Sequence, residues 1–405
     1  MIKGLLLTIL LLLLPQVATA AIILVGPNEN ITRIADAARV AKDGDTVLIM
    51  PGEYRGDVAV WTQKRLTIRG RGERPVLIAN GKSAEGKGIW VIRNGSFLID
   101  NIEFRNARVA DGNGAGVRLV RGLLQVKNCA FVDNQMGLMT ADFDDTELTV
   151  EDSLFVKATK QKQPLPHLLY VGKIAKLQVT GSRFHQGHTG HLIKSRARES
   201  NIRYNLIYDG PAGSASYELE FPNGGIAYVV GNVIGQSAKT ENRALIAYGA
   251  EGWAWPDNVL YLSHNTLLSD QIGGWFLRIW PDKFPDGIAV KGINNLTVGV
   301  GVFTQGVSGE FKGNFPALPS MLNAPDMLDF TLSSNSILRG RGIDLGRSVH
   351  PDLMPRAEFK LPIGIRSIDV PDQWTPGAFQ TQLYDQWAGK ILLTGILRHS
   401  CALLN

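Results

Sequence analysis

The chain has 405 residues, of which 44% are hydrophobic and 20% are charged, and its formal net charge is +5. This is the composition of an ordinary folded protein and excludes an intrinsically disordered chain. Its two cysteines, Cys129 and Cys401, exclude a disulfide scaffold, and the absence of a basic run with interleaved aromatic residues argues against a nucleic-acid partner.

The first twenty residues have the pattern of an export signal. Lys3 precedes an almost unbroken apolar run, and the small residues Ala18 and Ala20 flank Thr19 as at a signal-peptidase site. The run is too short to span a bilayer, and no later stretch of about 18 apolar residues follows. We therefore expect residues 1–20 to be a signal peptide and the protein to be periplasmic or extracellular, without membrane insertion.

Residues 32–41 predict a short helix. Ile34, Ala35, Ala38 and Ala41 recur at helical spacing, and residues 46–55 then form an apolar strand with a Pro-Gly turn. An amphipathic helix at this place would cover the open edge of a stack of strands.

A short marker, made of small or polar residues followed by an apolar one, recurs along the middle of the chain. It stands at residues 128–131, 152–155, 181–184, 205–207 and 232–234. The aligned markers are 23 to 29 residues apart. A period of this length without a helical pattern inside it predicts a solenoid.

Each repeat carries a second short strand downstream of its marker. These strands occupy residues 137–140, 168–171, 192–195, 218–221, 245–248 and 276–279. Because no helices separate the strands, the fold class is predicted to be all-β, a single-stranded right-handed parallel β-helix with an N-terminal capping helix. We expect this domain to span residues 21–380, to be monomeric, and to be followed by a tail at 381–405.

Two segments resemble the first and last coils of secreted, pectate-lyase-like parallel β-helix proteins, namely residues 44–54 and 376–379. More locally, Lys194-Ser195, the run 201–205 and Gly231-Asn232 resemble polysaccharide lyase family six, which contains chondroitinase B and alginate lyases. In that family the lysine before the serine is the general base. The resemblance therefore implies that role for Lys194.

The chain departs from family six at two places. The family's catalytic arginine has no counterpart in residues 220–225, and its calcium-binding carboxylates are replaced by a region that contains His188, Thr189 and His191. Neither site transfers to this chain. No cofactor is expected, since calcium is implied by the resemblance alone and its ligands are not matched.

Alignment of the second strands predicts one outward column of side chains. The column contains Tyr170, Lys194, Glu220, Ala247 and Arg278, on coils ~4.8 Å apart. Glu218 is expected on the same face as Glu220. The residues expected to border this surface are His191, Arg196, Tyr248 and Trp280. Such a surface suits an extended polysaccharide, with Tyr170, Trp280 and His188 as substrate contacts.

Cleavage of an acidic polysaccharide by β-elimination is the leading functional hypothesis. It assigns Lys194 as the base, Arg278 or Arg196 as the cation that neutralises a uronate carboxylate, and Tyr248 or His191 as the acid. Glu220 argues against Lys194 as the base, because a carboxylate ~5 Å away favours the charged form of the lysine by roughly 3 kcal/mol at an effective dielectric constant of about 20.

Three other interpretations remain open. Glu218 and Glu220, ~6.6 Å apart on a strand, are near the lower limit of roughly 6.5–9.5 Å for an inverting glycoside hydrolase. A non-catalytic carbohydrate-binding or export-scaffold protein would instead use its tryptophans, Trp253, Trp255, Trp275 and Trp280. His185, His188 and His191 could converge on one metal ion, but their spacing fits independent histidines in a polar turn better.

Overall fold

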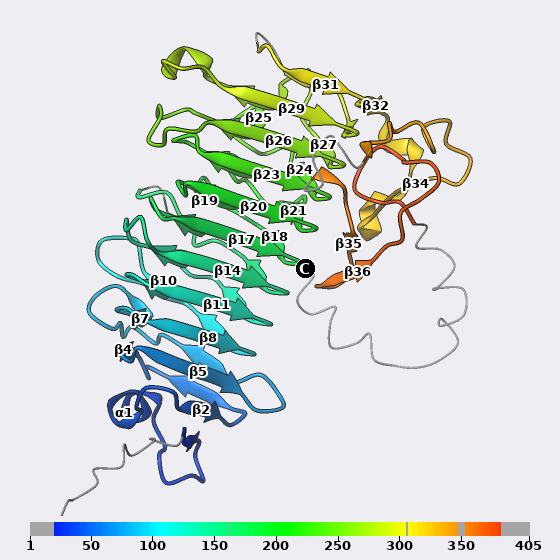
Figure 1. Cartoon of the computed structure of the whole chain (residues 1–405). Helices are drawn as coiled ribbons and strands as arrows, with labels where there is room; N and C mark the ends of the chain where they lie inside the picture. Colours follow the sequence, from blue (N-terminus) through cyan, green and yellow to red (C-terminus); the bar gives the residue numbers. More distant parts are fainter. Residues whose placement is uncertain (1–19, 162, 305–306, 347–352, 382–405) are drawn as a thin grey trace, which may run out of the picture.

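The computed structural model describes residues 20–161, 163–304, 307–346 and 353–381. Three long parallel sheets of twelve, nine and eleven strands wind together into a solenoid, and each regular coil contributes one strand to each sheet (Figure 1). The predicted all-β solenoid is confirmed. The expected signal peptide, apart from Ala20, and the chain beyond Thr381 lie outside the described residues.

The twelve-stranded sheet forms one face of the solenoid. In order it contains β1 (Ile22–Val25), β2 (Thr46–Ile49), β5 (Arg65–Gly70), β8 (Ser96–Asp100), β11 (Leu123–Lys127), β14 (Glu147–Glu151), β17 (Lys176–Thr180), β20 (Glu199–Arg203), β23 (Ile226–Val230), β26 (Val259–Ser263), β29 (Ala289–Ile293) and β31 (Glu310–Lys312).

The eleven-stranded sheet follows it in each coil. It contains β3 (Glu53–Arg55), β6 (Val76–Ile78), β9 (Glu103–Arg105), β12 (Ala130–Val132), β15 (Leu154–Val156), β18 (Arg183–His185), β21 (Leu206–Tyr208), β24 (Val233–Gln236), β27 (Thr266–Ser269), β30 (Leu296–Val298) and β32 (Phe315–Ala317).

The nine-stranded sheet carries the second strands of the sequence repeat. It contains β4 (Ala59–Trp61), β7 (Gly88–Ile92), β10 (Ala115–Leu119), β13 (Met136–Thr140), β16 (His167–Val171), β19 (Ile193–Ser195), β22 (Leu219–Phe221), β25 (Ala244–Tyr248) and β28 (Trp275–Ile279). The predicted grouping of these strands into one sheet is confirmed.

The sequence markers build the interior of the solenoid. Their phenylalanines Phe131, Phe155 and Phe184 continue a stack that begins at Phe104, with ring centroids 5.2, 4.5 and 4.6 Å apart. These distances match the ~4.8 Å spacing of neighbouring strands. The buried rings therefore stabilise the same register that the backbone hydrogen bonds set.

A buried polar ladder follows the turn between the twelve-stranded and eleven-stranded sheets. Each backbone N–H donates to the side chain of the matching residue one coil further on, at 2.9–3.1 Å. The ladder runs through Cys129, Ser153, Ser182, Asn205, Asn232, Asn265, Asn295 and Asn314. It explains why each marker contains a small or polar residue near its start, since buried N–H groups need acceptors.

The predicted capping helix is α1 (Ile34–Val40), and it lies at the N-terminal end of the stack (Figure 1). Ile34, Ala37 and Ala38 bury their side chains in the core. The Asp57 carboxylate accepts the N–H groups of Ile34 and Ala35, at 2.6 and 3.0 Å, and so satisfies free donors of the first turn.

The coils end earlier than residue 380. The last strands of the twelve-, eleven- and nine-stranded sheets are β31, β32 and β28, and after β32 the chain turns back along the solenoid (Figure 1). The described part of this return segment contains two 3-10 turns, Pro319–Met321 and Pro325–Met327. It also contains two antiparallel pairs, β33 (Leu322–Ala324) with β34 (Asp329–Leu332) and β35 (Ala357–Phe359) with β36 (Ile365–Ser367). A further 3-10 turn, Pro281–Lys283, lies in the solenoid between β28 and β29.

The return segment packs beside the turn that carries the polar ladder. Arg356 donates its N–H to the Tyr204 hydroxyl at 2.9 Å, and Gly364 donates to the carbonyl of Gly181 at 2.8 Å. Ala378 donates to the Thr266 hydroxyl at 3.0 Å. The return segment therefore does not continue the repeat, and its hydrogen bonds join it to several coils of the solenoid.

Candidate functional site

The outward column predicted on the nine-stranded sheet is present in the structure. The paired residues are Tyr170 with Lys194, Lys194 with Glu220, Glu220 with Ala247, and Ala247 with Arg278. The prediction of this column is confirmed because the apolar neighbours of its members, such as Ile193 and Leu219, are buried in the core and determine the register of the strands.

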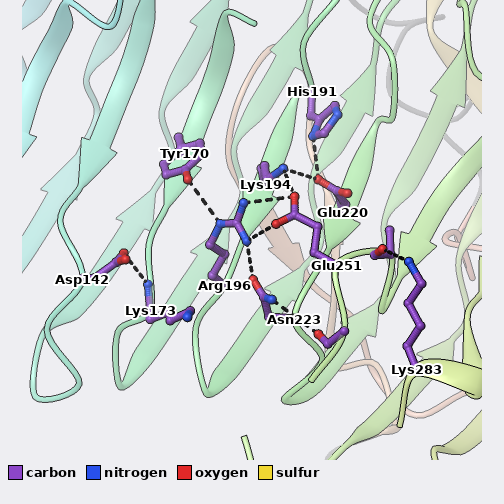
Figure 2. A network of polar contacts seen from close by, with 12 residues as sticks. Asp142, Tyr170, Lys173, His191, Lys194, Arg196, Glu220, Asn223, Glu251 and Lys283 are labelled. Carbon is purple, nitrogen blue, oxygen red and sulfur yellow. Dashed lines mark hydrogen bonds and ion pairs between the residues drawn. The ribbon is translucent and has the colours of Figure 1, made fainter. Parts of the chain in front are cut away.

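Lys194 is the centre of a compact ionic cluster on this column (Figure 2). Its Nζ lies 3.0 Å from Oε2 of Glu220 and 2.9 Å from Oε1 of Glu251. Lys194 is only 8% exposed. Two carboxylates therefore hold the ammonium group in a site from which most water is excluded.

Glu220 joins Lys194 to His191. The same Oε2 atom that faces Lys194 lies 2.8 Å from Nδ1 of His191. Burial alone would raise the pKa of Glu220, but the contacts with His191 and Lys194 outweigh it and lower the pKa. Glu220 is therefore a carboxylate at neutral pH.

A second histidine, His167, lies behind His191. The backbone N–H of His191 donates to Nδ1 of His167 at 2.9 Å, so the proton of the neutral His167 ring is on Nε2. Burial, and then the charges of His191, Lys194 and Arg196, lower the pKa of His167 well below its ordinary value. Sequence reasoning missed His167, although it stands three residues before Tyr170 as His191 stands before Lys194.

Arg196 binds the other carboxylate of the cluster through two nitrogens. Nη1 lies 2.6 Å from Oε2 of Glu251, and Nη2 lies 3.0 Å from Oε1. Nε donates to the Tyr170 hydroxyl at 3.2 Å, and Nη1 also contacts Asn223. Burial would raise the pKa of Glu251, but Arg196 and Lys194 outweigh it and lower the pKa to about 2.

Glu251 comes from the loop 249–258, which joins β25 to β26. The loop is fixed by its backbone and by one indole: Glu251 donates its N–H to the carbonyl of Pro222 at 2.8 Å, and Nε1 of Trp255 donates to the carbonyl of Arg196 at 2.9 Å. Glu251 was missed because a loop has no periodicity from which to place its side chains.

Arg278 lies at the far end of the column, between two indole rings. Its guanidinium carbon is 5.2 Å from the Trp275 ring centroid and 4.7 Å from that of Trp280. The side chain is exposed. The pKa of Tyr217 is raised by burial and then by Glu220, and the charge of Arg278 offsets part of this rise. Arg278 and Trp280 therefore form an aromatic and cationic surface three strands from Lys194.

Two predicted surface residues are found in the interior. Tyr248 is fully buried and donates its hydroxyl to the carbonyl of Gly225 at 2.6 Å, so it does not border the surface. Burial raises its pKa. Tyr248 follows the outward Ala247 and so points inward by the alternation of the strand.

Glu218 does not share an accessible face with Glu220. It precedes β22 and lies between Leu192 and Leu245 of the adjacent coils, both of which belong to the core. Glu218 is fully buried, and both carboxyl oxygens lack a hydrogen-bond partner. Burial, and then Asp209, raise its pKa well above the ordinary value, so Glu218 is a neutral acid.

The remaining histidines do not assemble a metal centre. Nδ1 of His188 lies 3.1 Å from the Ser214 hydroxyl, and burial followed by Arg183 lowers the pKa of His185 to about 3. Across the described residues, no three His, Cys, Asp or Glu side chains gather as metal ligands do. The ionic cluster also does not fit calcium, because Lys194 and Arg196 already neutralise its carboxylates.

Comparison with known proteins shows the fold. No family model matches the chain, and no curated protein matches its sequence. Among solved structures, the crystal structure of pectate lyase Pel9A matches with a TM-score of 0.61 and 13% sequence identity, over 91% of this chain and 98% of that one. The pectate-lyase-like β-solenoid is thereby shown, whereas the resemblance to polysaccharide lyase family six is not. No described helix is long and apolar enough to cross a bilayer.

Proposed function

We propose that the protein binds a uronic-acid-containing polysaccharide along the outward face of the nine-stranded sheet and cleaves it by β-elimination, with Lys194 as the base. The observation that carries this proposal is the convergence of Lys194 and Arg196 on a single carboxylate, that of Glu251. A uronate carboxylate has the same chemistry. The solenoid fold shared with a pectate lyase supports the same substrate class.

β-Elimination removes the proton next to the uronate carboxylate, so negative charge develops on that carboxylate. The two-nitrogen geometry of Arg196 suits its neutralisation, because a guanidinium binds both oxygens of a carboxylate. Nζ of Lys194 would accept the proton. The electron pair would form the new carbon–carbon double bond, and the glycosidic oxygen would leave with a proton from His191, the acid that remains once Tyr248 is excluded.

Glu251 has to be displaced for this reaction. Two carboxylates stabilise the ammonium form of Lys194, whereas a base needs the neutral amine. The Glu251 side chain is 43% exposed and the Glu220 side chain only 4%. The substrate carboxylate would replace Glu251 on Arg196, and the Glu251 side chain would turn into solvent while the loop backbone stays in place.

Hydrolysis is less well supported by the same carboxyl groups. A glycoside hydrolase of the two-carboxylate type needs an accessible, protonated carboxylic acid. Glu220 and Glu251 both have lowered pKa values and are ionised at neutral pH. Glu218 is protonated but fully buried.

The experiment that tests the proposal uses alginate, pectate, chondroitin and glucuronan as substrates. Elimination produces an unsaturated uronate that absorbs ultraviolet light, whereas hydrolysis produces new reducing ends alone. We expect absorbance to grow with the wild-type protein and with Ile272→Ala, a control at an 87% exposed side chain, and not with Lys194→Ala. New reducing ends without absorbance would show that the protein is a hydrolase and not a lyase. Binding without any product would show that the protein is a non-catalytic carbohydrate-binding scaffold.

We also propose that the protein acts after export, on the basis of the signal-like first twenty residues. N-terminal sequencing of the mature protein from the native host tests this. Removal of residues 1–20 is expected, and an intact N-terminus would contradict export by this route.

A further inference from the structure

A pocket of about 470 Å³ lies beside the ionic cluster, between the turn after β13 and the loop 249–258. Its lining includes Asp142, Phe143, Asp144, Lys173, Trp253 and Trp255. The pocket adjoins the cluster, because the lining residue Trp255 donates its indole N–H to the carbonyl of Arg196. Figure 2 shows Asp142 and Lys173 beside Arg196, on the two preceding coils.

Two aromatic side chains of the pocket are unusually exposed. Phe143 is 39% exposed and Trp253 is 55% exposed. The Arg121 guanidinium supports the Phe143 ring from 5.3 Å, and is itself held by both oxygens of Asp145 at 3.0 and 2.5 Å. Exposed apolar rings that line one pocket indicate a ligand with an apolar face, and the C–H face of a sugar ring has this property.

The charges of the pocket differ from those of the cluster. Among the lining residues, Asp142 and Asp144 contribute two carboxylates against the single ammonium of Lys173. The guanidinium groups of Arg118 and Arg121 lie near these aspartates from outside the lining. Asp142 is held in place, since its Oδ1 accepts the backbone N–H of Lys173 at 2.9 Å. Carboxylates accept hydrogen bonds from sugar hydroxyls, but they repel a second uronate. The pocket therefore favours a sugar without a carboxylate.

We infer that this pocket is a subsite for an uncharged sugar residue, and that the substrate is an acidic heteropolysaccharide in which uronic acid alternates with such a residue. The identity of the neighbouring uronate rests on the proposed function. Lys173, at the near end of the pocket, is one coil from Arg196, about 5 Å along the solenoid, and Asp142 is two coils away, about 10 Å. The near end of the pocket is thus placed for the sugar residue next to the uronate, so that the two subsites hold adjacent residues of one chain.

The loop keeps Trp253 in position without the Glu251 carboxylate. Ala254, next to Trp253, donates its N–H to the carbonyl of Asn223 at 3.0 Å, and Glu251 donates its own N–H to Pro222. Displacement of the Glu251 side chain by a uronate therefore leaves the wall of the pocket intact. Both subsites can be occupied at once.

Binding of oligosaccharides of equal length tests the inference. Calorimetric titrations would compare alternating acidic oligosaccharides, homopolymeric uronate oligosaccharides and uncharged oligosaccharides on the full-length Lys194→Ala protein, in which cleavage is blocked. We expect the alternating series to bind more tightly than the homopolymeric one. Trp253→Ala in that background should weaken the alternating series about tenfold, and Ile272→Ala should leave it unchanged.

The acidic residues give a second, independent readout. Asp142→Asn combined with Asp144→Asn should raise the affinity for homopolymeric uronates severalfold, because the repulsion is removed. Equal affinity of the two acidic series without dependence on Trp253 would overturn the inference. A preference for oligosaccharides with a cationic amino sugar that disappears in the Asp142→Asn, Asp144→Asn variant would show that the sugar in this pocket is charged, and would overturn the inference.

Failure of the proposed function has a different signature. In that case no acidic series would bind through Arg196, whereas uncharged oligosaccharides would still bind in a Trp253-dependent manner. Cleavage of homopolymeric uronates at a rate insensitive to Trp253→Ala would instead retain the proposed function and reject the uncharged-sugar subsite.

Discussion

Lys194 and Glu220 are paired across strands β19 and β22, with Nζ and Oε2 3.0 Å apart and each residue less than a tenth exposed. A buried carboxylate that loses its cation is costly, by about 3 kcal/mol. We therefore expect Lys194→Met to lower the free energy of unfolding by about that amount, partly offset by His191, which also contacts Glu220.

A double-mutant cycle isolates this interaction. Lys194→Met combined with Glu220→Leu removes both charges and should recover part of the lost stability, measured by urea unfolding. Strictly additive effects of the two substitutions would contradict a direct ionic coupling.

The second prediction concerns Glu251 as a competitor of the substrate. Glu251→Gln removes the carboxylate that occupies Arg196, and a partly exposed ion pair of this kind is worth up to about 1 kcal/mol. We expect KM for an acidic polysaccharide to fall by up to about fivefold, with kcat retained. Glu53→Gln, which breaks an exposed pair with Arg55, is the matched control. A loss of kcat in Glu251→Gln would show instead that Glu251 takes part in the reaction.

The third prediction uses the pH dependence of stability. The pKa of Glu218 is raised above its unfolded value by burial and then Asp209. Its contribution is therefore fully present below the unfolded value of 4.5 and is lost as pH rises toward the folded pKa. Glu218→Gln should remove this loss. The free energy of unfolding of the variant should therefore rise relative to that of the wild-type protein, by up to about 1.4 kcal/mol for each pH unit above 4.5.

Unfolding measured from pH 4 to pH 8 checks this prediction. Asp209, whose pKa burial raises to about 6, adds a decline of its own to both proteins, and its charge interacts with Glu218 in the wild-type protein alone. A constant difference between variant and wild type over this range would contradict a buried neutral Glu218.

The fourth prediction separates Tyr248 from the reaction. Its hydroxyl donates to a buried carbonyl and does not reach the surface. Tyr248→Phe should cost about 1 kcal/mol of stability and leave kcat unchanged. A large fall in kcat in a folded variant would restore Tyr248 as a candidate acid.

The sequence was sufficient for the fold and for the outward column, because apolar side chains repeat once per coil and determine the register. It was not sufficient for the partners of that column. Glu251 reaches Lys194 from a loop, where side-chain direction depends on individual hydrogen bonds rather than on a period. Glu218 was misplaced because the alternation of side chains holds within β22 and Glu218 precedes that strand.

The end of the solenoid shows the same limit. The Pro-Gly segment near residue 376 looked like a last coil, but Gly377 and Ala378 donate to Asn294 and Thr266 from the return segment. A local motif is compatible with either arrangement, since the choice depends on contacts between residues about 80 to 110 positions apart in the chain.

The mass of the cleavage products tests the central claim most directly. The wild-type protein would be incubated with an alternating acidic polysaccharide, and the products would be examined by mass spectrometry. Elimination adds no water, so we expect every new non-reducing end to be unsaturated and one water lighter than the same end made by hydrolysis, and we expect no products from Lys194→Ala. New non-reducing ends that are saturated would show hydrolysis and contradict the assignment of Lys194 as the base of an elimination.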